Sequence, residues 1–391
     1  MNSTNQSEQP RALVIGGSLG GLFAGNVLRS SGWRVDIYER SPRDLDSRGG
    51  GIVLQPEVTE MFRRSGMDID RVDLGVRSMH RTVLDPDGSI RSKSLAPQTQ
   101  TSWSLIYTTM QRAFGDDHYH RGKELIDIRQ DTARGQVTAR FRDGSEATGD
   151  LLIGADGSGS SVRQLMWPEA EPTYAGYLAW RGLVPEDRMS AAARLDLHGD
   201  FGFAGNRGSH ILGYLVPGAN NDTRAGHRLY NWVWYRVAGV DQLQQIMTDA
   251  DGRNRGFSLP EGKLAPAWRT HVRDEAERLL PPAFREVVHA THEPFAQAIR
   301  DLTVDSMVKG RVILLGDAAF IPRPHTAAST SKAAANALAL GQALDRFPTN
   351  VERALAHWEP RQLALGNTLY EQGSRTGDFL LFDKPWLDRA I

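Results

Sequence analysis

The sequence contains no cysteine among its 391 residues. This absence excludes disulfide bonds, a thiolate nucleophile and any metal centre with cysteine ligands. No metal site is predicted. A chain without cysteine suits a reducing compartment, and we therefore expect a cytoplasmic protein.

The chain also lacks long apolar runs and an excess of either charge. No stretch approaches the roughly 20 apolar residues of a membrane span, and residues 1–10 lack the apolar core of a secretion signal. The formal net charge of −1 gives no electrostatic reason to bind nucleic acid or an anionic membrane. The length predicts a soluble protein of about two to three structural lobes. The sequence does not fix the oligomeric state, and a homodimer stays open.

The N-terminal segment has the pattern of a nucleotide-binding unit. An apolar strand, Arg11 to Ile15, runs into the turn GGSLGG, apolar residues then recur at helical spacing, and a second strand ends at Glu39. In such a βαβ unit, glycines allow a tight turn and the helix N-terminus directs N–H groups at a pyrophosphate. Glu39 can accept hydrogen bonds from ribose hydroxyls. The residues of the predicted dinucleotide site are Gly16, Ser18, Leu19, Gly21 and Glu39.

Some features of this segment leave alternatives open. Ser18 replaces the middle glycine of the fingerprint, although its N–H and hydroxyl still permit a phosphate to approach. Glu39 favours a free ribose, as in FAD or NAD, whereas Arg40 and Arg43 keep a phosphorylated ribose open. The glycine run 49–51 either lets the backbone lie against a planar ring system or forms a mobile surface loop.

The middle of the chain is rich in predicted strands. Turn sequences at 85–88 and 142–145 predict two hairpins, and residues 177–183, 200–204, 210–216 and 228–237 predict four more strands. In the last strand, Tyr230, Trp232 and Trp234 share one face because side chains alternate. They either form the core of the sheet, which is our preferred interpretation, or flank a flat substrate. Helical spacing returns at 243–250, 265–280 and 351–375.

Two further apolar strands end in glycine-flanked aspartates. The segment DLLIGADGSGSSVR presents Asp156, and RVILLGDAAFIPRPH presents Asp317. A carboxylate at a strand end can order a neighbouring loop or accept hydrogen bonds from ribose or ribityl hydroxyls. A helix predicted to begin near Ala327 would bring its positive end to this edge, which suits the negative charge of a reduced flavin.

Together the three motifs resemble the single-component (group A) FAD-dependent aromatic hydroxylases, the p-hydroxybenzoate hydroxylase family, over essentially the whole chain. Within that family, QPEV at 55–58, EPTYAGYLAWRG at 171–182 and GDAAFIPRPHTAA at 316–328 are similar to members that act on dihydroxypyridines. The resemblance implies an α/β fold. It consists of a Rossmann-like FAD-binding domain of the glutathione-reductase type, an inserted β-rich substrate domain and a C-terminal helix.

The resemblance also implies a reaction. FAD is held non-covalently, NAD(P)H is a transient co-substrate, and one oxygen atom of O2 is transferred through a flavin C4a-hydroperoxide. The acceptor is an electron-rich aromatic or N-heteroaromatic ring such as a hydroxypyridine. Competing functions on the same scaffold are a flavin-dependent oxidase, dehydrogenase or epoxidase, and a protein that keeps FAD without catalysis. The exact substrate and the choice between NADH and NADPH stay open.

Carried over residue by residue, the resemblance assigns the cofactor contacts. Asp317 falls at the ribityl chain, Pro324 beside the isoalloxazine, and Ala327 and Ala328 where N–H groups face the flavin. The other predicted contacts are Gly16, Ser18, Leu19, Gly21, Glu39, Arg40, Arg48, Gln55 and Asp156. The sequence departs from the family at three places. Trp103 replaces a pyrophosphate-binding arginine, Asn336 replaces an aspartate, and Ala-Ala-Ser at 327–329 replaces G-x-G, so Arg48 is predicted to supply the missing cation.

The catalytic residues are predicted from the chemistry of oxygen transfer. A ring is activated when its hydroxyl loses a proton, and a positioned base contributes ~10²–10⁴-fold to such a step. His210 and Tyr214 share one face of a predicted strand, so either could take the proton directly or through water, or both are ordinary residues of the sheet. His325 either lies near the ring or caps the following helix.

The predicted division of the chain is discontinuous. Residues 1–75, 100–172 and 290–345 form the FAD-binding domain, and residues 76–99 and 173–289 form the β-sheet substrate domain. Residues 346–391 form a C-terminal helical segment.

Overall fold

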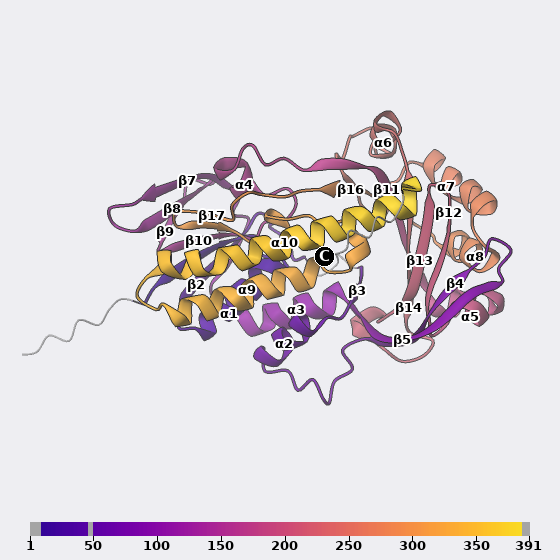
Figure 1. The fold of residues 1–391 in the computed structure, drawn as a ribbon, viewed down its shortest axis with the longest axis horizontal. Coiled ribbons are helices and arrows are strands. Elements are labelled where there is room, and N and C mark those ends of the chain that lie inside the picture. The colour runs from indigo at the N-terminus through magenta and orange to yellow at the C-terminus, as the bar shows by residue number, and fades with distance from the viewer. Residues whose placement is uncertain (1–8, 46–49, 385–391) are drawn as a thin grey trace, which may run out of the picture.

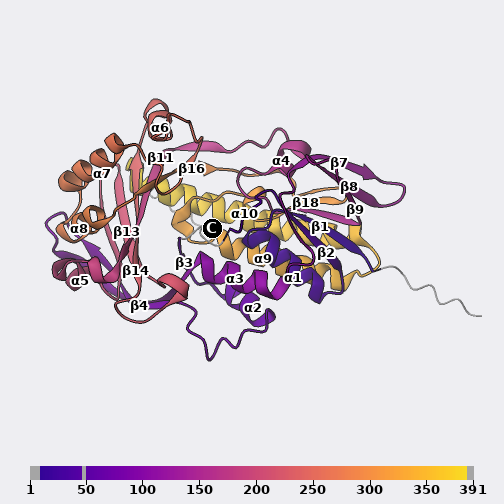
Figure 2. The same cartoon turned by 180° about the vertical axis from the view of Figure 1, so that it is seen from behind.

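The computed structural model describes residues 9–45 and 50–384. Figure 1 shows an elongated molecule with β-sheet lobes towards its two ends, and the long helix α10 (Val351–Phe382) extends along both. The same two lobes are seen from behind in Figure 2. The predicted residues Arg48 and Gly49 lie outside the described part of the chain.

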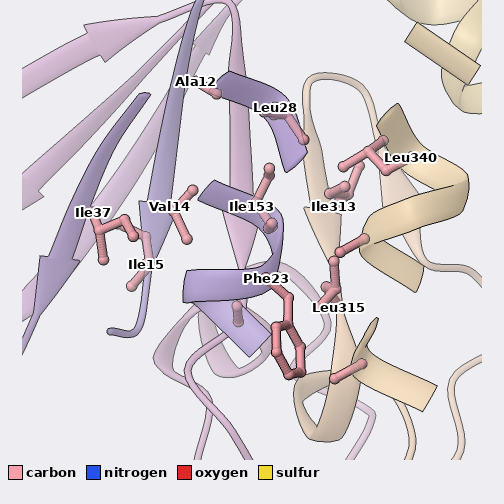
Figure 3. Close-up of a cluster of buried hydrophobic side chains, with 14 of the residues drawn as sticks. Ala12, Val14, Ile15, Phe23, Leu28, Ile37, Ile153, Ile313, Leu315 and Leu340 are labelled. Atoms are coloured by element: carbon pink, nitrogen blue, oxygen red, sulfur yellow. The ribbon is translucent and has the colours of Figure 1, made fainter. Parts of the chain in front are cut away.

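One lobe is built on a mainly parallel six-stranded sheet. Its apolar runs suit strands that are buried on both faces, and Ile153 and Ile313 are fully buried. Figure 3 shows them beside Phe23 of α1 (Leu19–Ser30) and Leu340 of α9 (Ser329–Arg346). The strand order is β17 (Val308–Lys309), β18 (Val312–Leu314), β10 (Leu151–Gly154), β1 (Arg11–Ile15), β2 (Arg34–Glu39) and β6 (Tyr119–Arg121).

The other lobe is a nine-stranded sheet. Tyr230, Trp232 and Trp234 are fully buried in a core beneath α7 (Pro266–Leu279) and α8 (Pro282–Ala290), which confirms the preferred interpretation of this stripe. The opposite face is directed at the first lobe. The order is β15 (Ser258–Leu259), β16 (Phe295–Asp301), β11 (Thr173–Pro185), β14 (Leu229–Val237), β13 (Ser209–Val216), β12 (Phe201–Asn206), β4 (Val76–Leu84), β5 (Ile90–Ser102) and β3 (Gly51–Val53).

Both predicted hairpins form. β4 pairs with β5, and β8 (Gln136–Phe141) pairs with β9 (Glu146–Gly149) in a small sheet that also contains β7 (Leu125–Asp131). The strand predicted to continue to 153 is broken at Asp150. There the carboxylate accepts the N–H of Arg11 at 2.8 Å, and the chain passes into β10 of the parallel sheet.

The strand pairing disagrees with one predicted boundary between the two domains. β16 pairs with β11 and β15 in the nine-stranded sheet, whereas the sequence placed residues 290–345 in the cofactor domain. None of the described helices is both long and apolar enough to cross a membrane. The remaining helices are α2 (Pro56–Arg64), α3 (Trp103–Phe114), α4 (Ser161–Met166), α5 (Ala191–Leu197) and α6 (Val240–Ile246).

Candidate active site

The three glycine turns meet at the carboxyl edge of the six-stranded sheet. β1, β10 and β18 are neighbours there. A Cβ atom built on Gly16 would lie 2.6 Å from the Cα atom of Asp156, and one built on Gly20 would lie 3.5 Å from the side chain of Leu315. The motifs that were predicted to share one cofactor are therefore in contact.

The first turn leaves the N-terminus of α1 open. Gly16 has a φ of +103°, and a side chain there would also strike the carbonyl oxygen of Ala155. Gly21 packs on the turn, because its Cβ would meet the carbonyl of Gly16. Ser18 is the N-cap residue, yet its hydroxyl makes no capping hydrogen bond. The first-turn N–H groups, from Leu19 onward, have no intrahelical partner, so this end of the helix can receive an anion.

Glu39 lies at the end of β2 beside this turn. Its carboxylate accepts the N–H of Gly17 at 2.8 Å and the N–H of Ser41 at 2.7 Å. Each carboxylate oxygen has a further lone pair for a ribose hydroxyl. The adjacent Arg40 is exposed.

In the second motif, Asp156 caps a helix. Its carboxylate accepts the hydroxyl of Ser160 at 2.5 Å and the N–H of Ser161 at 2.6 Å, at the start of α4. Arg163 of α4 is buried and donates to the carbonyl of Ala318 at 2.9 Å, which ties this motif to the third. A direct contact between Asp156 and a cofactor stays a prediction.

The third motif contains a buried cation that the sequence analysis missed. Lys332 in the first turn of α9 donates to Asp317 at 3.0 Å and also to the carbonyl of Phe320. Burial lowers the pKa of Lys332, and the Asp317 carboxylate opposes that shift. The oxygen of Asp317 that accepts from Lys332 also accepts from Ser329 at 2.6 Å. Asp317 is partly exposed, and its second oxygen makes no hydrogen bond within the described chain, so it can receive a ribityl hydroxyl.

A second open helix end follows this motif. Ala327 adopts the left-handed conformation with a φ of 52°, and Ala328 occupies the N-cap of α9 without a side-chain hydrogen bond. The N–H groups of the first turn of α9 are therefore uncapped. Pro324 is an exposed residue of the short turn before them. Gln55, at the N-cap of α2, lines a groove together with Thr59 of α2 and Thr99 of β5.

Two of the three predicted catalytic residues, His210 and His325, lie close together. The His325 ring lies 4.7 Å from the ring of Tyr235 and 6.4 Å from the ring of His210, measured between centroids. Burial lowers the pKa of His210 to about 4 and, together with His210 and Arg323, lowers the pKa of His325 to about 3. Both imidazoles are thus neutral at pH 7.

The hydroxyl of Tyr214 connects β13 to β3, the edge strand of the same nine-stranded sheet. The O–H group donates to the carbonyl of Gly51 in β3 at 3.0 Å. A Cβ atom on Gly51 would lie 2.5 Å from the Tyr214 ring, so only glycine fits there. Because its proton is engaged, Tyr214 can offer its oxygen lone pairs to a bound ring.

The sequence analysis did not identify Tyr177, Arg181 or Tyr235 as site residues. The hydroxyl of Tyr177 is 2.8 Å from Nε2 of His325, and a Cβ atom on Gly50 would lie 2.8 Å from the Arg181 guanidinium. Tyr177 and Arg181 share one face of β11, while Leu178 and Trp180 enter the core on the other. Arg181, a cation in an otherwise apolar strand, was the one signal in the sequence that could have identified this face as part of the site.

The residues present fit a bound FAD. Two helix N-termini without side-chain caps, α1 and α9, lie at the edge where the strand-end carboxylates Glu39 and Asp317 offer unused lone pairs. Uncapped N–H groups suit the pyrophosphate and the electron-rich edge of a flavin. Fold and site together define a flavoprotein whose nucleotide-binding sheet faces a polar and aromatic β-sheet.

Comparison with known proteins gives the family. Residues 10–179 match the FAD binding domain family, and residues 174–301 match a family described as FAD binding domain-like. The chain is 35% identical over 358 residues to 2,6-dihydroxypyridine 3-monooxygenase of Paenarthrobacter nicotinovorans, covering 91% of this chain and 88% of that protein. It is 30% identical over 364 residues to FAD-dependent urate hydroxylase of Klebsiella pneumoniae, covering 90% and 85%. The chain belongs to the FAD-dependent aromatic hydroxylases.

The solved structures agree. The structure of 2,6-dihydroxypyridine-3-hydroxylase from Arthrobacter nicotinovorans matches with a TM-score of 0.90 and 33% identity, covering 97% of this chain and 95% of that one. The predicted fold class, the cofactor FAD and the monooxygenase class are thereby confirmed.

The departures from the family pattern have structural counterparts. Trp103 begins α3 and stacks on Tyr107, with 4.8 Å between ring centroids. Asn336 accepts the N–H of Gly316 at 3.1 Å and donates to Gln362 of α10 at 2.8 Å. Asn336 therefore links the third motif to the C-terminal helix.

Proposed function

We propose that this protein is an NAD(P)H-dependent FAD monooxygenase that hydroxylates a hydroxylated N-heteroaromatic ring of the hydroxypyridine type. One observation carries the proposal. The loop that begins with Asp317 ends with His325, whose ring packs against His210 and Tyr235 of the nine-stranded sheet. The loop predicted to hold the flavin thus also borders the polar face on which a flat substrate would lie. The relatives named above act on a dihydroxypyridine and on urate, both nitrogen-containing rings.

Two groups of residues would hold the cofactor, one at each of its ends. The N–H groups of α1 and the carboxylate of Glu39 would bind the ADP half. Asp317 and the start of α9 would bind the ribityl chain and the flavin edge. When bound, FAD supplies electron transfer from the nicotinamide and activation of O2. The protein must orient the ring, activate it and exclude water.

Ring activation would come from the polar face of the sheet. His210 is neutral and its buried Nδ1 atom makes no hydrogen bond within the described chain. It is therefore available to a bound ligand as a hydrogen-bonding group. The positive charge of Arg181, which already opposes the rise in the pKa of Tyr214 that burial causes, would stabilise a ring oxygen that has lost its proton. Such a deprotonated ring is electron-rich and reacts more readily with an electrophilic oxygen.

The proposal is tested with the purified protein. We expect flavin absorbance, and oxidation of NADH or NADPH that accelerates when hydroxylated pyridines are added, with one oxygen atom recovered in the product by mass spectrometry. Oxidation of substrate without a new ring hydroxyl would indicate an oxidase or dehydrogenase instead. A protein that neither contains nor takes up FAD would overturn the proposal.

Location and assembly are part of the proposal. The absence of cysteine and the near-neutral net charge support a cytoplasmic protein without affinity for nucleic acid or membranes, and we include a homodimer as the working assembly. Cell fractionation and light scattering after size-exclusion chromatography test these statements. Sedimentation with membranes, or a monomeric mass at micromolar concentration, would contradict them.

A further inference from the structure

Tyr177 and His325 form a hydrogen-bonded pair that links β11 to the segment following the third motif. The Tyr177 hydroxyl is 2.8 Å from Nε2 of His325, and the Tyr177 side chain is fully buried in β11. His325 lies in the turn Pro324–Thr326 and is only partly buried. Within the described chain, His325 makes no other hydrogen bond, so its Nδ1 atom remains available on the side of the ring away from Tyr177.

Both members of the pair are neutral at physiological pH. Burial, together with the neighbouring His210 and Arg323, lowers the pKa of His325 to about 3. Burial raises the pKa of Tyr177 well above its ordinary value, although Arg323 opposes this. The groups that face the His325 ring are Tyr177 from β11, Tyr235 from β14, His210 from β13 and Arg323 from its own segment, and none of them is a carboxylate.

The direction of the hydrogen bond follows from the surroundings of Tyr177. The Arg323 guanidinium lies 5.6 Å from the centroid of the Tyr177 ring. A guanidinium has N–H donors and no acceptor, so the tyrosine proton cannot be accepted there. Nε2 of His325 is the acceptor that remains among the described residues. The reverse arrangement would leave a buried O–H group unpaired, which costs about 1–3 kcal/mol.

Arg323 is itself held rigidly. It donates to Asp301 of β16 at 2.8 Å and to Asp378 of α10 at 2.8 Å. Its charge therefore stays next to Tyr177, and the segment that carries His325 is fixed between a strand and the C-terminal helix.

We propose that Tyr177 is a positioning residue that fixes the tautomer of His325, with Nε2 accepting and Nδ1 carrying the proton, so that His325 donates a hydrogen bond to an oxygen of the bound ring. His325 then cannot serve as the base, because its one lone pair is occupied. This inference rests on the proposed function for the identity of the ligand, and it narrows the ligand to rings that present an acceptor oxygen beside the flavin.

The tautomer is measured directly by nitrogen NMR. The protein is labelled with ¹⁵N only in its 11 histidines, and the His325 signals are assigned as those missing from the His325→Gln variant. We expect a protonated Nδ1 and an unprotonated Nε2 in the FAD-loaded protein. Tyr177→Phe removes the donor, and the His325 signals should become those of a tautomer mixture. Tyr174→Phe, which removes a different phenol O–H from β11, should leave them unchanged.

Kinetics supply the second readout and do not depend on the fate of Tyr177→Phe. Glutamine at position 325 can accept from Tyr177 and donate to a ligand at once, whereas leucine can do neither. His325→Gln should keep kcat and raise KM no more than about 10-fold, the equivalent of one hydrogen bond, while His325→Leu should lose much more of kcat/KM.

Two results would overturn the inference: a protonated Nε2 in the wild-type protein, or equal loss of activity in His325→Gln and His325→Leu, which would identify a base. If His325 has the expected tautomer but the protein hydroxylates no ring, the role of Tyr177 in fixing the tautomer is upheld and the proposed function is refuted.

Discussion

The contact between Asp317 and Lys332 affects the stability of the fold and is also proposed to affect cofactor binding. Lys332 is buried to about the same degree as the core around it, and its ammonium group depends on Asp317 and the Phe320 carbonyl for hydrogen bonds. The second carboxylate oxygen of Asp317 makes no hydrogen bond within the described chain, and we propose that it binds the cofactor. A substitution at Asp317 therefore has two separable effects.

Asp317→Ala is expected to lower flavin occupancy and to lower the free energy of unfolding by about 1–3 kcal/mol, because a buried ammonium group loses a partner. Flavin content is measured by the absorbance ratio of the purified protein, and stability by urea unfolding of the apoprotein. The double variant Asp317→Ala/Lys332→Met removes the unpaired charge, so it should recover stability without recovering flavin. Unchanged flavin retention in Asp317→Ala would remove the role assigned to this carboxylate.

At the scale of an element, the edge strand β6 and its neighbour β2 are joined by a cluster around Asp36. Its carboxylate accepts from Arg11 at 2.8 Å, from His118 at 2.9 Å and from His120 at 3.1 Å. Burial would raise the pKa of Asp36, but these hydrogen bonds outweigh it and lower the pKa from 3.8 to about 2. The ionised carboxylate is thus favoured by folding.

This cluster predicts how stability changes with pH. Because the pKa of Asp36 is lower in the folded chain, its stabilising contribution is complete above about pH 4 and is lost as the pH falls from about 4 to about 2. Urea unfolding of the wild type should therefore weaken more steeply over that interval than unfolding of Asp36→Asn. Parallel pH profiles for the two proteins would show that the cluster has no such effect.

The junction of β3 with β13 is a second element-scale feature. A Cβ atom on Gly51 would lie 2.5 Å from the Tyr214 ring and 2.7 Å from Val216, whereas one on Gly50 would meet only the guanidinium at the far end of the long Arg181 side chain. Gly51→Ala should therefore displace β3, break the Tyr214 hydrogen bond to the Gly51 carbonyl and reduce kcat/KM for the ring substrate by about tenfold or more. Gly50→Ala is the matched control and should stay within a few-fold of wild type. Equal kinetics in both variants would contradict this account of the junction.

At the scale of the whole molecule, α10 holds the two lobes together. It packs on α9 beside the parallel sheet, and farther along it reaches the nine-stranded sheet, as Figure 1 shows. Two glycines of α10 allow this helix to pack closely against Arg323 and Tyr177. Gly373 packs against the backbone of Arg323, and a Cβ atom on Gly377 would lie 2.6 Å from the Tyr177 hydroxyl.

Gly377→Val is expected to push α10 away from the site and disturb Tyr177 and Arg323 together. Substrate-induced changes in the flavin spectrum should weaken, and thermal unfolding should shift to lower temperature. Arg375→Ala alters an exposed residue of the same helix and should change neither property. A normal flavin response in Gly377→Val would show that α10 does not support the polar face.

The parts of the site that follow from short segments were predictable. Gly16, Glu39 and Asp317 lie in strand–turn–helix units whose geometry is set within about 30 residues, so their positions at one sheet edge followed from the sequence. Tyr177 and Arg181 were not predictable in the same way. They reach the site because β11 pairs with β14 and β16, which are distant in sequence.

Two observations show what a local pattern leaves open. The carboxylate of Asp156, expected to order a neighbouring loop or to bind a ribose, accepts the N–H groups of Ser161 and Val162 at the start of α4, and its contact with a ribose stays a prediction. The conspicuous aromatic stripe of β14 faces the core, and the less conspicuous residue Tyr235 on the other face reaches His325. A pattern of alternation identifies two faces but does not say which one is covered by helices.

The loop that carries both Asp317 and His325 constrains how this enzyme can diverge. Mutations that adapt this loop to a ring of a different shape would also disturb the proposed binding of the prosthetic group. Strands β12 to β14 have no contact of this kind with the proposed cofactor site. One of their faces packs in the core beneath the helices, and the other is the face proposed to border the ring. We therefore expect selectivity for a new substrate to arise first from mutations in the nine-stranded sheet, while the loop from Asp317 to His325 stays unchanged.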